Sequence, residues 1–112
     1  MKYGAVVERS RSEVEVLLRS RQGSDIGDAL LSAAYYDPDW RWVQAQCLTF
    51  SRHEDAGVRW VAATCFGHLA RIHCQLDLEP VLQRLVDMRS DPSVAAAADD
   101  ALEDIRFFLK SQ

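Results

Sequence analysis

The chain has 112 residues, of which 48% are hydrophobic and 27% are charged, and its formal net charge is −4. This composition is typical of one folded domain and excludes a disordered or collagen-like chain. Its 13 lysines and arginines face 17 acids, which argues against nucleic acid as a direct ligand and favours a basic protein partner.

The N-terminal third predicts two helices. Ser12 and Glu15 have the spacing of a capping box and predict the start of the first helix. Gly23 predicts the end of that helix. Apolar residues at helical spacing follow, and they predict a second helix that begins at Ser24 or Asp25.

The middle of the chain repeats itself. The segment DPDWRWVQAQCLTF at positions 37–50 reappears as DAGVRWVAATCFGH at positions 55–68, with six identical aligned positions. Each copy places apolar residues at helical spacing, so the two copies predict two consecutive helices. Asp37 followed by Pro38 predicts the start of the first of these helices, and Asp55 predicts the start of the second.

The C-terminal third predicts two more helices. The stretch DLEPVLQRLVDM places Pro80 in or near the first turn of a short helix. Asp91 and Pro92 then cap an apolar run that continues to the C-terminus. Six helices with an internal period of about 36 residues indicate an all-α fold of stacked helical hairpins.

The second copy resembles a known family. DAGVRWVAATCFGHLA is similar to the second helix of a HEAT repeat, with an Asp at the turn, small residues in the middle and a late glycine. The resemblance implies a short α-solenoid of three hairpins, a single domain 1–112 with repeats at about 10–36, 37–73 and 74–110. It also implies that Asp55 and Arg59 are structural residues that join adjacent repeats. The third copy departs from the pattern, since Ala95 stands in the place of the arginine.

Several patterns could carry chemistry, and we interpret each as structural. A metal oxygenase of the HEAT-like class needs several His-Glu pairs, and the sequence offers one, His53 with Glu54. Structural zinc favours ligand pairs on separate elements, whereas the four possible ligands lie along one helix and its exit. These ligands are Cys65, His68, His73 and Cys74. The acids of the last helix fit a solvated side, so we expect no catalytic residue, no metal and no cofactor.

The two repeated tryptophans, Trp42 and Trp60, lie off the main apolar stripe of their helices. Trp60 shares its side of the helix with Thr64, Gly67 and Arg71. Two interpretations stay open. Each tryptophan could pack between helices, or both could project in register on one surface of aromatic and charged residues that binds a partner. The predicted partner-binding residues are Tyr35, Tyr36, Asp37, Asp39, Arg41, Trp42, Trp60 and Arg71.

Stacked hairpins build surface rather than catalytic sites, so the sequence predicts a non-enzymatic protein-binding module. Its size, acidity and architecture resemble those of small bacterial immunity proteins and antitoxins. The resemblance implies a basic toxin, such as a nuclease, as the partner. One alternative is an enzyme or accessory of the bilin-lyase type, which also has HEAT-like repeats. The other is a structural adaptor or homodimer.

We expect a cytoplasmic location. No apolar run approaches the roughly 18 residues of a membrane span, and the start MKYGAVVERS becomes charged too early for a signal peptide. The three cysteines are odd in number, which fits a reducing compartment better than a disulfide framework.

Overall fold

The computed structural model describes residues 5–109. The chain folds into six α-helices, and the described residues contain no strand, so the predicted all-α class is confirmed. The ends of the predicted domain 1–112 and the last residue of the predicted repeat 74–110 lie outside the described residues. The helices are α1 (Arg11–Leu18), α2 (Gly23–Tyr36), α3 (Trp40–Phe50), α4 (Ala56–His73), α5 (Leu78–Met88) and α6 (Ala95–Leu109).

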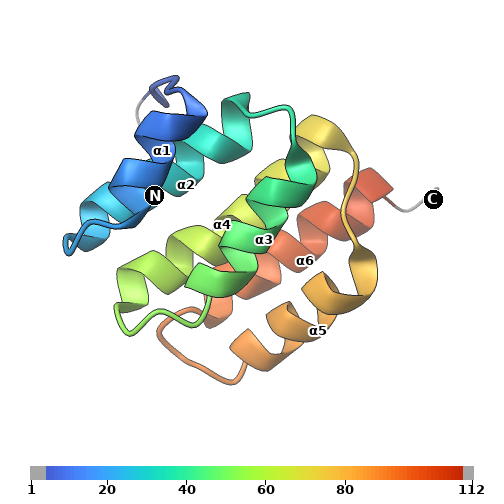
Figure 1. Cartoon of the computed structure of the whole chain (residues 1–112). Helices are drawn as coiled ribbons and strands as arrows, with labels where there is room; N and C mark the ends of the chain where they lie inside the picture. Colours follow the sequence, from blue (N-terminus) through green and yellow to red (C-terminus); the bar gives the residue numbers. More distant parts are fainter. Residues whose placement is uncertain (1–4, 110–112) are drawn as a thin grey trace.

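The helices pair into three hairpins, α1 with α2, α3 with α4 and α5 with α6, and the hairpins stack in two layers (Figure 1). In the view of Figure 1, the first layer of α1, α3 and α5 lies in front of the second layer of α2, α4 and α6. In the second layer, α4 packs closely against both α2 and α6. None of the described helices has both the length and the apolar character that a membrane span requires.

The second layer packs closely because many of its buried positions are small. Alanine lets two helix axes approach further than leucine would, because its side chain ends at Cβ. Phe66 of α4 is also fully buried, and such burial stabilises the fold by about 3 kcal/mol. The buried alanines of the layer are Ala29, Ala33, Ala34, Ala62, Ala63, Ala70, Ala97, Ala98 and Ala101.

The start of α1 differs from its sequence prediction. Ser10 is the N-cap, since its hydroxyl accepts a hydrogen bond from the Glu13 amide and the Glu13 carboxylate accepts one from the Ser10 amide. The predicted pair, Ser12 with Glu15, has the same spacing two residues further on. Because both pairs fit the capping-box pattern, the pattern alone could not choose between them.

Gly23 is the first residue of α2 and does not end the preceding helix, which stops at Leu18. The start of α2 therefore lies one or two residues before the predicted Ser24 or Asp25. A Cβ atom on Gly23 would lie 2.6 Å from Oδ2 of Asp55. The glycine is required by the close approach of α2 to the start of α4, rather than by the end of α1.

The predicted cap of α3 is also corrected. Asp39, not Asp37, is the N-cap, and its carboxylate accepts a hydrogen bond from the Trp42 amide. Asp37 is the C-cap residue of α2, and its carboxylate accepts hydrogen bonds from the Asp39 amide and the Arg11 guanidinium. Pro38 consequently lies in the connection before α3. The Asp37 carboxylate is thus occupied by Arg11, which comes from a different helix.

The starts of α4 and α5 agree with prediction, whereas the start of α6 does not. Asp55 caps α4 by accepting hydrogen bonds from two amides of its first turn, and Pro80 lies in the first turn of α5. In the third copy, α6 begins only at Ala95. Asp91 instead holds the turn before α6, because its carboxylate accepts a hydrogen bond from the Ser93 amide.

Arg59 joins the second hairpin to the third. Its guanidinium donates to the carbonyl oxygens of His53 and Glu54, in the turn between α3 and α4. The same group lies 3.2 Å from the Ser93 hydroxyl and 3.3 Å from the Asp91 carboxylate. These bonds confirm a structural role for Arg59. They also place the starts of α4 and α6 at the same end of the molecule, so the two helices run in the same direction.

Candidate partner-binding surface

The eight residues predicted to bind a partner do not lie on one surface. Trp42 is in the first turn of α3, in the first layer, whereas Trp60 is near the start of α4, in the second layer (Figure 1). Because α3 and α4 form an antiparallel hairpin, their starts lie at opposite ends of the molecule. Of the two interpretations left open, the one in which both tryptophans project in register on one surface is therefore wrong. Equivalent residues of the two copies fall on helices of opposite direction.

Trp42 and three residues near it form what we call the first-layer cluster: Arg11, Asp37, Asp39 and Trp42. The Arg11 guanidinium lies 3.9 Å from the centre of the Trp42 ring. Its Nε lies 2.7 Å from Oδ2 of Asp37, and its Nη2 lies 3.7 Å from the Asp39 carboxylate. The hydrogen bond from Arg11 lowers the pKa of Asp37. Sequence reasoning missed Arg11, and these contacts tie α1 to α3.

Tyr36 and Arg41 also make contacts within the chain. The Tyr36 hydroxyl donates to the carbonyl oxygen of Val6, and 44% of the residue is exposed. The Arg41 guanidinium lies 4.7 Å from the centre of the Trp40 ring and 3.9 Å from the Asp77 carboxylate. Both side chains therefore connect segments of this chain to one another.

The remaining predicted residues, Tyr35, Trp60 and Arg71, share the outward side of the second layer. Trp60, Thr64 and Arg71 recur at helical spacing on one side of α4, as the sequence predicted. Arg71 lies eleven residues after Trp60, which corresponds to about 16 Å along the helix. Tyr35 of α2 joins this side at its far end, where its hydroxyl lies 3.4 Å from Nη2 of Arg71.

His68 packs between these two residues. Its ring meets the Tyr35 ring edge to face with the centres 5.0 Å apart, and its Nδ1 lies 2.8 Å from Nη2 of Arg71. Arginine can only donate, so Nδ1 accepts and the proton sits on Nε2. Burial, together with the charge of Arg71, lowers the pKa of His68 to about 4. His68 is therefore neutral at pH 7 and adds no positive charge to this side.

Asp104 of α6 lies over Gly67 of α4. A Cβ atom on Gly67 would be 2.7 Å from Oδ2 of Asp104 and 3.4 Å from Cα of Ala101, so the glycine permits α6 to approach. Burial raises the pKa of Asp104, while the charge of Arg71 opposes the rise. Asp100 lies one turn before Asp104. Within residues 5–109, the ion pairs shorter than 4 Å use other carboxylates than these two.

Two shallow clefts flank α4 near Trp60. One, of about 370 Å³, lies between α2 and α4, with Asp28 at its edge and Val61 in its wall. The other, of about 280 Å³, lies between α4 and the turn before α6 and is lined by Trp60, Val61 and Ser93. Val61 and Gly57 line both clefts, so apolar surface continues across α4. We call this whole side the second-layer face: Asp28, Tyr35, Trp60, Val61, Thr64, His68, Arg71, Asp100 and Asp104.

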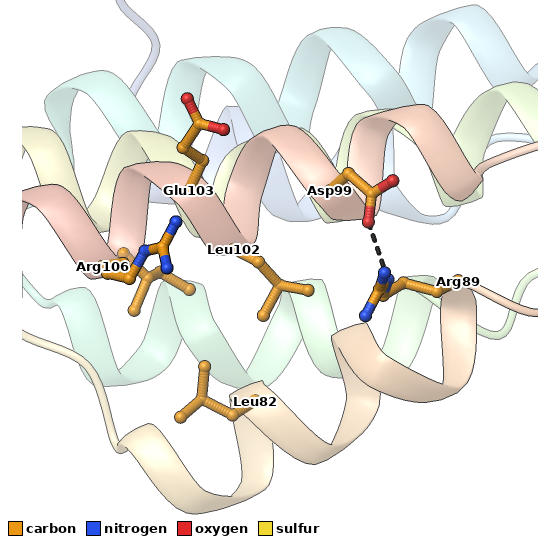
Figure 2. Close-up of a pocket in the computed structure, with 7 residues that line it drawn as sticks. Leu82, Arg89, Asp99, Leu102, Glu103 and Arg106 are labelled. Atoms are coloured by element: carbon orange, nitrogen blue, oxygen red, sulfur yellow. Dashed lines mark ion pairs between the residues drawn. The ribbon is translucent and has the colours of Figure 1, made fainter.

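A larger hollow of about 640 Å³, the α5–α6 groove, lies between the last two helices. Figure 2 shows Leu82 of α5 and Leu102 of α6 in the space between the helices. The Arg89 guanidinium and the Asp99 carboxylate form an ion pair of 2.7 Å at its edge. Glu103 and Arg106 also line the groove. Its two arginines and two acids balance in charge.

The acids of the second-layer face were missed because sequence reasoning assigned the last helix a solvated acidic side. The sequence does not show which edge of α6 lies beside α4. Two signals were available. Asp100 and Asp104 are four residues apart and so share one side of the helix, and Gly67 on α4 marks a position where another helix can approach closely.

The candidate metal ligands have other roles. Cys65 is fully buried in the core, and its hydrogen bond with Cys47 together with burial raises the pKa of its thiol. Nδ1 of His53 accepts a hydrogen bond from the Asp55 amide. In the part of the chain that the structure describes, no three histidine, cysteine, aspartate or glutamate side chains are grouped so that they could hold a metal ion.

Comparison with known proteins gives one informative likeness. No protein-family profile matches the chain, and no curated protein does so. Among solved structures, a chain in the crystal structure of a CDI complex from Cupriavidus taiwanensis LMG 19424 matches with a TM-score of 0.85. The two chains are 37% identical, and the match covers 96% of this chain and 97% of the other. The likeness therefore extends over all three hairpins.

Proposed function

The chain belongs to the same protein family as the matched chain of the CDI complex, and on that premise we propose that it is an immunity protein. CDI denotes contact-dependent inhibition. In this role the chain binds a cognate toxin and blocks its activity. The observation that carries the proposal is the 37% identity over nearly the whole of both chains, since a shared fold alone would not favour one function over another.

The activity that we propose is binding rather than catalysis. All three histidines of the sequence make contacts within the fold: His53 with a backbone amide, His68 with Arg71, and His73 with the carbonyl oxygen of Ala34 at 3.3 Å. His68 has a pKa of about 4, whereas an acid–base catalyst at neutral pH works best with a pKa near 7.

We further infer that the fold is HEAT-like and that the toxin is basic. The three stacked hairpins and the bonds from Arg59 across consecutive turns support the first inference. The net charge of −4 supports the second, because opposite net charges speed the encounter of two proteins.

The test uses a candidate cognate toxin, and we expect its gene to lie directly before the gene of this chain. Cells that produce this toxin should stop growing, and co-production of the chain should restore growth. Purified toxin and chain should form a complex by calorimetry and size-exclusion chromatography. The matched control is the other component of the Cupriavidus taiwanensis complex, which should bind this chain much more weakly than the cognate toxin. Absence of both rescue and a complex at about 10 μM protein would contradict the proposal.

A further inference from the structure

Three surfaces of the described chain are candidates for contact with the toxin, and the inference below rests on the proposed immunity function. They are the first-layer cluster, the α5–α6 groove and the second-layer face. They differ in how much of their polar surface is already bonded within the chain and in their net charge.

The first-layer cluster has little bonding capacity to offer. Its arginine, Arg11, already donates to Asp37 and covers the ring of Trp42. The two oxygens of Asp37 accept from Arg11 and from the Asp39 amide. A partner that used these groups would have to replace bonds that hold α1 against α3.

The α5–α6 groove is the larger hollow, but its charges do not favour a basic partner. Arg89 is paired with Asp99 at 2.7 Å, and Arg106 stands near Glu103 on the same rim (Figure 2). A basic segment entering the groove would meet two arginines as well as two acids. Its attraction would therefore be largely cancelled.

The second-layer face combines the features that the other two surfaces lack. Asp28 is exposed at one side of α4 and Asp100 at the other, and none of the ion pairs among residues 5–109 uses either. Between them, Trp60 is half-buried beside the two apolar clefts. The face carries three acids, Asp28, Asp100 and Asp104, against one arginine, Arg71, so its net charge favours a basic partner. A large aromatic residue such as Trp60 is a suitable anchor on such a surface.

The helices that carry the second-layer face are packed tightly against one another. The helices α2, α4 and α6 pack closely through small residues, so the spacing of the acids on α2 and α6 across α4 is fixed before a partner arrives. Binding to a preformed surface loses less conformational freedom than binding to a flexible one.

We propose that the second-layer face is the surface that docks the toxin, and that the toxin presents to it a segment of lysine and arginine side chains with one apolar side chain among them. The cations pair with Asp28 on α2 and Asp100 on α6, and the apolar side chain fills a cleft beside Trp60. Asp104, which is half-buried on α6 beside Gly67 of α4, pairs with a lysine or arginine of the toxin segment that crosses α4.

Two pairs of matched variants test this proposal by calorimetry with the cognate toxin. The first pair compares Asp28→Lys with Asp100→Lys, made together, against Glu15→Lys with Asp87→Lys, made together on exposed residues of the first layer. Both double variants change the net charge by the same amount. We expect the face variant to weaken binding by about 100-fold and the first-layer variant by less than about 5-fold.

The second pair compares the two repeated tryptophans. Trp60→Ala should weaken binding by about 30-fold, whereas Trp42→Ala should leave the dissociation constant within about 3-fold of wild type, because Trp42 contacts Arg11 of the same chain. Circular dichroism and thermal unfolding show whether each variant is folded. The charge variants involve exposed residues and keep the test decisive if a tryptophan variant unfolds.

The outcomes separate this inference from the proposed function. If wild type binds the toxin and both face variants bind equally well, the docking surface is elsewhere and the immunity function stands. Loss of binding in Leu102→Glu, with the face variants unaffected, would assign docking to the α5–α6 groove and overturn this inference. If wild type forms no complex with the toxin, the proposed function fails, and the docking inference fails with it.

Discussion

The two layers of the molecule are held together in different ways. In the second layer, α4 packs directly against α2 and α6 through small buried side chains. In the first layer, α1, α3 and α5 make few direct contacts with one another. Apolar packing therefore holds the helices of the second layer in place. The helices of the first layer must be held in place by other interactions.

Hydrogen bonds from polar side chains hold the helices of the first layer in place. Gln44 of α3 is buried, its Nε2 donates to Oδ2 of Asp77 at 2.9 Å and its Oε1 accepts from the Asp77 amide at 2.8 Å. The Arg84 guanidinium of α5 donates to the hydroxyl and the carbonyl oxygen of Ser51. Individual bonds of this kind contribute about 1 kcal/mol each. The arrangement of the first layer thus depends on hydrogen bonds from a few residues, and the arrangement of the second layer depends on many apolar packing contacts.

The largest effect is expected from the buried ring of Phe66 on α4, the middle helix of the second layer. Phe66→Ala removes a fully buried ring and should lower the free energy of unfolding by about 3 to 5 kcal/mol, because a cavity remains where α4 met its neighbours. Urea unfolding monitored by circular dichroism measures the change. Phe107→Ala is the matched control, since Phe107 is 64% exposed, and its loss should cost less than about 1 kcal/mol. Equal effects of the two variants would show that the second layer is not the core.

A smaller effect is expected when a bridge of the first layer is broken. Asp37→Asn removes the charge that Arg11 pairs with, and at pH 7 it should lower the free energy of unfolding by about 1 kcal/mol. The Arg11 side chain is 39% exposed, so solvent screens the pair and keeps the effect modest.

The pH dependence of this variant has a definite sign. The pKa of Asp37 is lowered in the folded state by the hydrogen bond from Arg11. Its stabilising contribution is therefore complete above the unfolded pKa of about 4 and is lost as the pH falls through the lower folded value. The free energies of unfolding of wild type and Asp37→Asn should differ at pH 7, and the difference should shrink progressively as the pH falls below about 4. A difference that stays constant as the pH falls through this range would mean that the ion pair is not its cause.

The contrast between the layers explains which parts of the fold the sequence predicts. Apolar periodicity and the repeated segment predicted all six helices, because both report on packing within and between neighbouring helices. The starts of α1 and α3 were misplaced by two residues. At each of these starts, two polar residues fit the same capping pattern, so the local sequence could not choose between them. At α3, Asp39 is the cap, and Asp37 accepts a hydrogen bond from the distant Arg11.

The candidate surface was predicted in part for the same reason. The side of α4 that carries Trp60 and Arg71 follows from helical spacing alone. Its neighbours, Asp28 on α2 and Asp100 on α6, depend on how three helices are rotated about their axes, and that rotation is decided by packing against small residues such as Gly67. The pairing of Trp60 with Trp42 failed because the two copies are the two antiparallel helices of one hairpin, so equivalent residues lie at opposite ends of the molecule.

The smallest effect is expected at the boundary between the layers, where α4 of the second layer gives way to α5 of the first. Cys74 ends α4 with φ 53° and ψ 32°, the left-handed conformation that glycine adopts without steric cost. Cys74→Gly should raise the free energy of unfolding by about 0.5 kcal/mol, since relief of the Cβ clash exceeds the added freedom of the unfolded chain. Cys74→Ala keeps a Cβ atom and should show no such gain. Thermal unfolding of the three proteins measures the difference, and a glycine variant less stable than wild type would show that contacts of the Cys74 side chain outweigh the backbone strain at this boundary.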